Sequence, residues 1–324
     1  MAAAALGDVL AAVVDEQVAA LAAHEQGARE DAPDAVHQYR VTLRRLRSVL
    51  GAFSAELEPA AAAAGLDLPT LTGRLRDAAR AFGLARDAEV NAELVAEALG
   101  RGALPAADDA DEAGRLLTEA AVAAYQDHRI SAIALLDGYG PETLGAVLAA
   151  VAAAAREAAG GAEGDAAGEA AREPTRALAG DADAAFAGTI DEQAARVLTL
   201  ARKAKRAAPG DAVTALHEVR KKAKRLRYTI EELTAHDVAV PPGRQDVVDA
   251  AHRIQKHLGT HHDSVGVADF IRSTLHDRPA TGRRAVTTAV AFAAGTLAGA
   301  EAAVQEAALR KYRKARRALR DALT

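Results

Sequence analysis

Two clusters of basic side chains carry the clearest chemistry in this 324-residue sequence. The first, in residues 36–47, contains four arginines and no acidic residue. The second, in residues 217–227, contains six cationic residues and a single acid, Glu218. Arginine suits phosphate because its planar group donates two parallel hydrogen bonds, whereas lysine acts as a point charge. Each cluster is therefore a candidate site for a phosphate-rich anion, and many cations along two helices suit a long repetitive anion better than one small ester.

Both clusters follow the spacing of an α-helix that has two different faces. In each case an apolar seam runs along the helix, and a basic stripe lies beside it. The seam residues are Val36, Tyr39, Leu43, Leu46, Leu50 and Phe53 in the first helix, and Leu216, Val219, Ala223, Leu226, Ile230 and Leu233 in the second. Cations this close to a buried seam line the edge of a groove, which recruits the opposite charge.

The two clusters share one pattern, H-x-x-R-x-x-x-[RK]-R-L-R, and its histidines, His37 and His217, are 180 residues apart. A second pattern, [LF]-G-x-x-x-D, follows each copy at residues 82–87 and 258–263, with an offset of 176 residues. Because two blocks keep their order and nearly their spacing, the sequence predicts an internal duplication.

The paired histidine–arginine helices, each followed by an [LF]-G-x-x-x-D block, resemble the CHAD family, the conserved histidine α-helical domain, over nearly the whole chain. This resemblance implies two pseudo-symmetric four-helix bundles around a basic central pore that binds inorganic polyphosphate. It also implies a binding and targeting module without catalysis. The expected parts are a first half in residues 1–159, an Ala/Gly/acidic linker in 160–188 and a second half in 189–324. Recruitment to polyphosphate granules and tuning of a partner enzyme of polyphosphate metabolism are both left open.

The candidate polyphosphate-binding residues come from the two motif helices and from the helix before the second one. They are His37, Arg40, Arg44, Arg45 and Arg47, then His217, Arg220, Lys221, Lys224, Arg225, Arg227 and Tyr228, and finally Arg202, Lys203 and Arg206. The histidines and Tyr228 could instead pack at the seam edge. Asp87 and Asp263 suit either helix caps or partners that hold a motif arginine. The basic run in residues 310–320 either extends the groove or is a solvated helix end.

Composition fits an all-α protein, because aromatic residues are only 3% and alternating β-branched runs are absent. The net charge is −5, so the basic clusters are local features of an acidic chain. The absence of cysteine fits a reducing compartment, and the N-terminus lacks a basic signal-peptide region, so we expect a cytoplasmic location. No cofactor is expected. The uncharged run in residues 285–300 is expected to be a buried bundle helix and not a membrane span.

The ten prolines predict the helix boundaries, since each is expected where a helix begins or ends. We expect the helix that starts near Pro69 to break at Gly83 and to resume at Asp87. The helix that leads to the second motif is expected over residues 189–207.

Two other function classes are compatible with parts of the sequence. Basic helices also bind nucleic acids, but only Tyr39 and Tyr228 interleave with the cations, so stacking platforms are scarce. His252 and the His261–Asp263 triplet suggest an HD-type metal phosphohydrolase, which needs further converging ligands. The equivalent triplet, residues 85–87, contains no histidine, so the duplication explains the block without a metal.

Overall fold

The computed structural model describes residues 4–100, 108–140, 143–160, 176–276 and 286–324, and within them the chain forms helices and no strand. The predicted all-α class is therefore confirmed. The helices are α1 (Leu6–Arg29), α2 (Ala35–Ala52), α3 (Ser54–Ala63), α4 (Leu68–Gly100), α5 (Asp108–Asp137), α6 (Leu144–Gly160), α8 (Ala182–Arg206), the short 3₁₀ helix η2 (Pro209–Asp211), α9 (Ala212–Ala235), α10 (Gln245–His276) and α11 (Thr288–Ala322). None of the described helices is long and apolar enough to cross a membrane.

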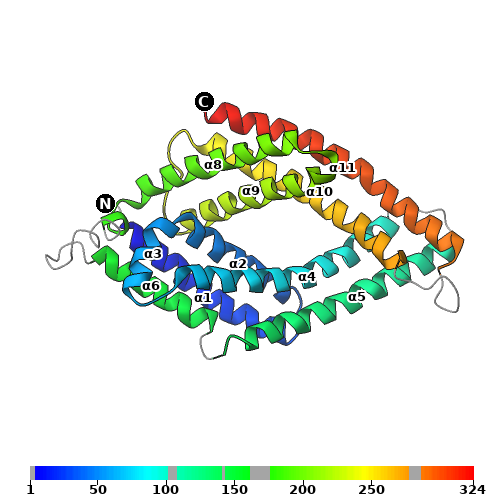
Figure 1. Ribbon diagram of the computed structural model, residues 1–324, viewed down its shortest axis with the longest axis horizontal. Coiled ribbons are helices and arrows are strands. Elements are labelled where there is room, and N and C mark those ends of the chain that lie inside the picture. The colour runs from blue at the N-terminus through cyan, green and yellow to red at the C-terminus, as the bar shows by residue number, and fades with distance from the viewer. Residues whose placement is uncertain (1–3, 101–107, 141–142, 161–175, 277–285) are drawn as a thin grey trace.

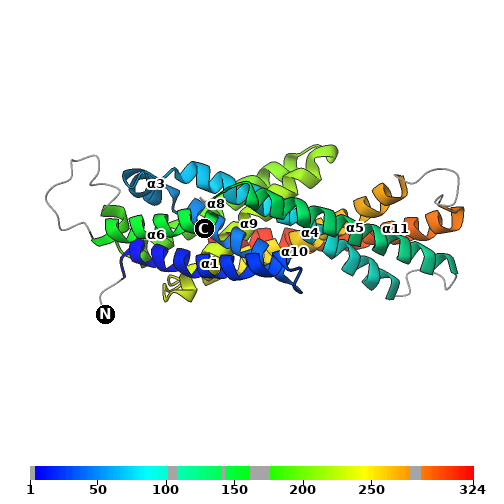
Figure 2. The same ribbon diagram turned by 90° about the horizontal axis from the view of Figure 1, so that it is seen from below.

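The molecule is elongated and flat, and its two motif helices lie in the middle (Figure 1; Figure 2). Helices α2 and α9 contact each other, although they are far apart in the sequence. Helix α4 packs on α2, and α10 packs on α9. Two long hairpins, α4–α5 and α10–α11, extend toward one end of the molecule, where α5 meets α11 (Figure 1). This arrangement places the basic stripes of both halves at a shared centre.

The predicted seams form part of the larger hydrophobic core. All six seam residues of the first motif helix are at most 2% exposed, and in the second motif helix Leu216 alone is only partly buried. A smaller core closes the far end of the hairpins, where Val95 of α4, Leu117 of α5, Ile271 of α10 and Leu297 of α11 pack together. The seams are buried because a stripe at helical spacing has to face neighbouring helices.

The expected break at Gly83 is wrong, because α4 runs without interruption from Leu68 to Gly100. Phe82 and Ala85 are fully buried on either side of Gly83, so core packing maintains the helix through a residue that costs only about 1 kcal/mol there. Asp87 and Asp263 consequently lie inside α4 and α10, where neither can cap a helix N-terminus.

Two further predictions of helix boundaries need correction, and so does one prediction of helix burial. Pro59 lies inside α3, where the burial of Leu57 and Ala61 holds the helix despite the missing N–H group. Helix α8 begins at Ala182, within the segment predicted as a linker, and residues 161–175 of that segment lie outside the described part of the chain. In the first turns of α11, Val290 is buried but Phe292 is 71% exposed, so this run is amphipathic and only one of its faces is buried.

Candidate anion-binding site

Helices α2, α4 and α9 enclose a basic groove of about 460 Å³ at the centre of the molecule, which we call the motif groove. Helix α9 contributes His217, Arg220, Lys221, Lys224, Arg225 and Tyr228, helix α2 contributes Arg44, Arg47 and Ser48, and helix α4 contributes Arg76, Ala79 and Arg80. A second cavity of about 350 Å³ shares Arg47, Arg76 and Arg225 with it. The two cavities are therefore neighbours that share three arginines, and we call them together the channel.

Each [LF]-G-x-x-x-D block seats the first arginine of its motif helix. The Arg40 guanidinium lies 3.0 Å from the Asp87 carboxylate, and the Arg220 guanidinium lies 3.5 Å from the Asp263 carboxylate. A Cβ atom added at Gly83 would lie 3.5 Å from Arg40 Nε, and one added at Gly259 would lie 3.8 Å from Arg220 Nε. The guanidinium thus passes within ordinary contact distance of the glycine position, and the aspartate one helical turn later holds it. Of the two roles predicted for these aspartates, the structure supports the one that positions an arginine.

Four partly buried cations of the channel have no acidic partner. Within the described part of the chain, the side chains of Arg44, Arg47, Lys224 and Arg225 form no ion pair and no hydrogen bond. Burial and the neighbouring cations lower the pKa of Lys224 to about 6 and that of Arg44 to about 10. The same two causes lower the pKa of Arg47 and Arg225. The free site therefore holds more positive charge than its surroundings stabilise, and a bound anion would relieve this.

Tyr228 lines the motif groove, and its ring lies against two cations of α9, Lys224 and Arg227. It is only 3% exposed, and its ring centroid lies 5.5 Å from Lys224 Nζ and 4.8 Å from Arg227 Cζ. These distances fit cation–π contacts, which hold both cations against the ring. Tyr228 therefore packs as a core residue and also orients Lys224, the one of these two cations that lines the groove.

The two motif histidines have different surroundings. His217 lines the groove and packs against the ring of His262 with centroids 4.6 Å apart. His37 does not line the groove and lies near Arg86. Burial, followed by nearby cations, lowers the pKa of both histidines, and burial lowers the pKa of His262 to about 3. Nδ1 of His37 and Nδ1 of His217 are buried without a hydrogen-bond partner among the described residues.

Several predicted site residues lie outside the motif groove. Arg45 pairs with the buried Glu232 of α9 at 3.1 Å, and Arg227 pairs with Glu231 at 3.3 Å. Arg202 and Arg206 line a different pocket, whereas Lys203 is exposed on α8 and lines neither that pocket nor the motif groove.

The contrast between Arg45 and Arg225 shows how the two halves differ, because these residues are equivalent in the two motifs. In the first half, the position equivalent to Glu232 is occupied by Ala52, so Arg225 has no carboxylate partner at the corresponding place. A Cβ atom added at the adjacent Gly51 would lie 3.4 Å from Arg225 Nη1. Arg45 is thereby neutralised, while Arg225 remains free for the channel.

Arg76 and Arg80 are groove residues that the motif comparison missed. They lie on the same face of α4 as Gly83 and Asp87, since positions 76, 80, 83 and 87 follow helical spacing. That spacing was the signal in the sequence, because a face that seats Arg40 also faces the motif helix. With Arg44 and Arg47, these two residues give the first half as many groove cations as the second.

The histidines that suggested a metal site do not converge on one point. His262 packs against His217, whereas His261 is 6% exposed and His252 is exposed. Within the described ranges, no three His, Cys, Asp or Glu side chains are grouped closely enough to hold a metal ion.

Comparisons with known proteins agree with this architecture. The profile of the CHAD domain matches residues 12–272. The chain is 31% identical over 323 residues to two uncharacterized proteins of Mycobacterium tuberculosis, MT2285 of strain CDC 1551 and Rv2226 of strain H37Rv, and the alignment covers 95% of this chain and 54% of each relative. It therefore spans about half the length of these relatives.

Two solved structures have a similar fold. The CHAD domain from the plant Ricinus communis has a TM-score of 0.66 and 24% identity, and the match covers 98% of this chain and 93% of that one. PptA from Streptomyces chartreusis has a TM-score of 0.64 and 19% identity, with coverage of 96% and 99%. Together with the profile match, these similarities show that the chain belongs to the CHAD domain family.

Proposed function

We propose that this chain binds inorganic polyphosphate in the motif groove and acts as a non-catalytic binding module. The proposal rests on one observation. Four cations from both halves of the chain lie together in the channel, and none of them has an acidic partner in the described residues: Arg44, Arg47, Lys224 and Arg225. A polyanion would replace the missing carboxylates with phosphate oxygens that accept charge-assisted hydrogen bonds.

The shape of the channel favours a thin, flexible polyanion. Helices α2, α4 and α9 wall the motif groove, and the second cavity is also lined by α3. The side chains of Arg44, Arg47, Lys224 and Arg225 are all partly buried there. A linear phosphate chain can enter such a channel and contact several cations in sequence. A DNA duplex is far thicker, since its major groove alone is about 12 Å wide, so it can contact only the outer edge.

Calorimetric titration with long-chain polyphosphate, repeated with duplex DNA of equal total charge, tests the proposal. We expect strong binding of polyphosphate, with an affinity that falls log-linearly as salt increases, and weak competition by DNA. Arg44→Gln with Lys224→Gln should weaken binding, whereas Arg115→Gln with Arg272→Gln, which changes the charge equally outside the groove, should not. Equal affinity for duplex DNA would favour a nucleic-acid-binding function. Release of phosphate that depends on divalent cations would favour an enzyme.

We also propose that binding serves to target or regulate other proteins. A fluorescent fusion of the full chain should concentrate on polyphosphate granules, and Arg44→Gln with Lys224→Gln should disperse it. If the variant concentrates on granules as well as the unchanged chain does, the groove is not what recruits it.

A further inference from the structure

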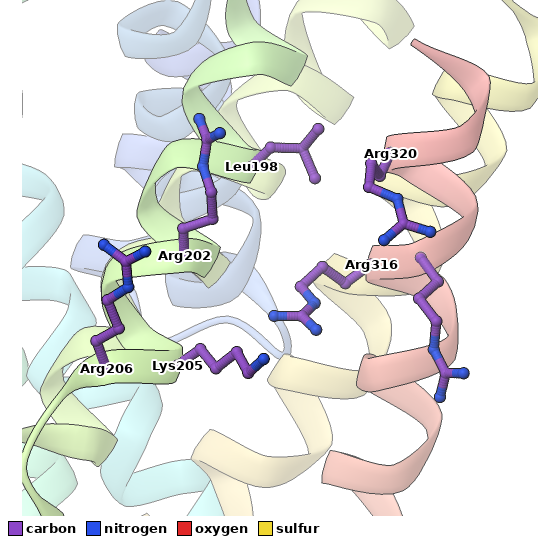
Figure 3. A pocket seen from close by; sticks show the side chains of 7 residues that line it. Leu198, Arg202, Lys205, Arg206, Arg316 and Arg320 are labelled. Atoms are coloured by element: carbon purple, nitrogen blue, oxygen red, sulfur yellow. The ribbon is translucent and has the colours of Figure 1, made fainter. Parts of the chain in front are cut away.

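A second basic pocket lies between the C-terminal parts of α8 and α11 and has a volume of about 400 Å³. Its cations are Arg202, Lys205 and Arg206 of α8, and Arg316, Arg317 and Arg320 of α11. Figure 3 shows the two sets on opposite walls, with Lys205 and Arg316 pointing toward one another across the gap. Leu198 is also part of the lining. We call this the α8–α11 pocket.

Most of the cations in this pocket lack an acidic partner. Arg320 is paired with its neighbour Asp321 at 2.8 Å, but the other five form no ion pair in the part of the chain that the structure describes. Two acids of α8 are occupied elsewhere, since Asp191 pairs with Arg244 and Glu192 pairs with Arg196. Apart from Asp321, no carboxylate of either helix forms an ion pair with a pocket cation among the described residues.

The helix dipole explains only part of this arrangement. Cations near the C-terminal end of one helix are stabilised by its exposed carbonyl groups. That effect is as favourable when the cations point outward as when they face other cations. Two cationic helix ends facing each other repel instead, because like charges a few ångströms apart interact unfavourably even though most of these side chains are exposed. The arrangement therefore fits a bound anion better than a solvated surface.

We propose that the α8–α11 pocket is a second polyphosphate-binding site, separate from the motif groove. The inference rests on the proposed function of the motif groove for the identity of the ligand. The two sites share no lining residue, and both are walled by arginines that can bind phosphate oxygens with paired donors. A long polymer can occupy both sites at once, whereas an oligomer of a few phosphates occupies each site independently.

Two sites on one chain predict an affinity that depends on polymer length. When one segment of a long polymer is bound, the rest is held at a high effective concentration near the other site. Binding of the long polymer is then stronger than binding at either site alone. Losing the α8–α11 pocket should weaken binding of long chains about tenfold and should leave the motif groove's affinity for short chains unchanged.

The experiment is a calorimetric titration with inorganic tripolyphosphate and with long-chain polyphosphate. The pocket variant is Arg202→Gln with Arg316→Gln, and the groove variant is Arg44→Gln with Lys224→Gln. The control, Lys311→Gln with Lys314→Gln, removes two charges from α11 outside the pocket. Should the pocket variant lose helix content, Lys205→Gln with Arg317→Gln tests the same pocket.

We expect two equivalents of tripolyphosphate to bind the unchanged chain and the control, and one equivalent to bind each of the other variants. For long chains, the slope of log affinity against log salt should become shallower by about 1.4 in the pocket variant, as expected for two lost contacts with a single-stranded polyanion. One equivalent in the unchanged chain, abolished in the groove variant and kept in the pocket variant, would overturn this inference and leave the proposed function standing. Absence of binding to either polyphosphate in the unchanged chain would overturn both.

Discussion

At the scale of single residues, Lys224 is the group whose charge state responds most to a ligand. Its ammonium lies near Arg44, Arg220 and Arg40, and burial together with these cations lowers its pKa to about 6. At pH 7 to 8 the free side chain is therefore mostly neutral. A polyanion in the groove favours the ammonium form and raises the pKa again, so that binding takes up a proton.

The first prediction is that polyphosphate affinity falls as pH rises above about 6. The loss should approach tenfold per pH unit, because each binding event then has to protonate Lys224. The pKa values of His37 and His217 lie below the usual 6.5 in the free protein, so the histidines add to this slope only to the extent that bound phosphate raises those values. Titrations in buffers of different ionisation enthalpy measure the protons taken up.

The control for this prediction is Lys224→Arg, which keeps the charge at all these pH values. The variant should bind with a flatter pH profile and take up fewer protons. Because both proteins see the same ligand, protonation of polyphosphate itself cancels in the comparison. An identical slope in the two proteins would show that Lys224 stays charged in the free protein.

The second prediction concerns stability without ligand. Between about pH 6 and 10.5 the unfolded chain binds a proton at Lys224 that the folded chain does not bind, so stability rises with pH across this window. Lys224→Met removes this penalty and should raise the free energy of unfolding near pH 6 by at least about 1 kcal/mol, since one pKa unit corresponds to about 1.4 kcal/mol. The gain should shrink toward pH 10, as measured by urea unfolding. A methionine variant that is less stable at pH 6 would contradict it.

At the scale of elements, each [LF]-G-x-x-x-D block is a seat that α4 or α10 provides for a motif arginine. Asp87 holds Arg40 and Asp263 holds Arg220, each beside a glycine one turn earlier. These arginines are only 14% and 12% exposed, so their positions are fixed before a ligand arrives. Fixed donors lose little conformational entropy on binding.

The third prediction follows from this positioning. Asp87→Asn with Asp263→Asn makes the protein more positive, so a purely electrostatic view expects tighter polyphosphate binding. We expect instead about fivefold weaker binding, roughly 1 kcal/mol, because Arg40 and Arg220 lose their orientation. The matched control, Glu119→Gln with Asp269→Asn, removes two acids that pair outside the groove. Tighter binding in the first variant than in the control would refute the positioning role.

The fourth prediction concerns the contribution of α4 to the groove. Arg76→Gln with Arg80→Gln should weaken polyphosphate binding about tenfold, comparable to Arg44→Gln with Arg47→Gln. Both pairs line the motif groove, the first from α4 and the second from α2. Circular dichroism should show unchanged helix content. Wild-type affinity would mean that α4 serves only as scaffold, and that the motif helices alone contact the ligand.

At the scale of the whole molecule, the two halves share one hydrophobic core. The larger core contains Leu10 of α1, Leu46 of α2, Leu226 of α9, Ile254 of α10 and Leu319 of α11. The Thr229 hydroxyl of α9 also donates a hydrogen bond to the Ser48 carbonyl oxygen of α2 at 3.4 Å. The two motif helices contact each other, and the groove between them depends on both halves.

The fifth prediction is a single unfolding transition in calorimetry, in spite of the predicted duplication. A shared core couples the halves, and a ligand that binds only the folded groove raises the transition temperature of the whole chain. Polyphosphate should shift the transition upward more at pH 6 than at pH 8, because Lys224 is charged at the lower pH. Two separate transitions, with only one shifted by polyphosphate, would show that the halves unfold independently.

The sequence alone determined the helical class, the apolar seams and the recurrence of an [LF]-G-x-x-x-D block after each motif helix. These features are local or periodic, so they can be predicted directly from the spacing of residues such as Leu43 and Leu226. The continuation of α4 through Gly83 was not predictable in this way. A glycine weakens a helix locally, whereas the burial of Phe82 and Ala85 that maintains it arises from other helices.

Only the tertiary structure decided which cations meet and which are neutralised. Arg45 and Arg225 occupy equivalent motif positions, yet Arg45 pairs with Glu232 while Arg225 lies unpaired beside Gly51. The cations of α8 likewise face those of α11, far along the chain, and not the motif groove. Charge–charge interactions act through space over a few ångströms, so residue type and helical spacing cannot fix them until packing brings distant helices together.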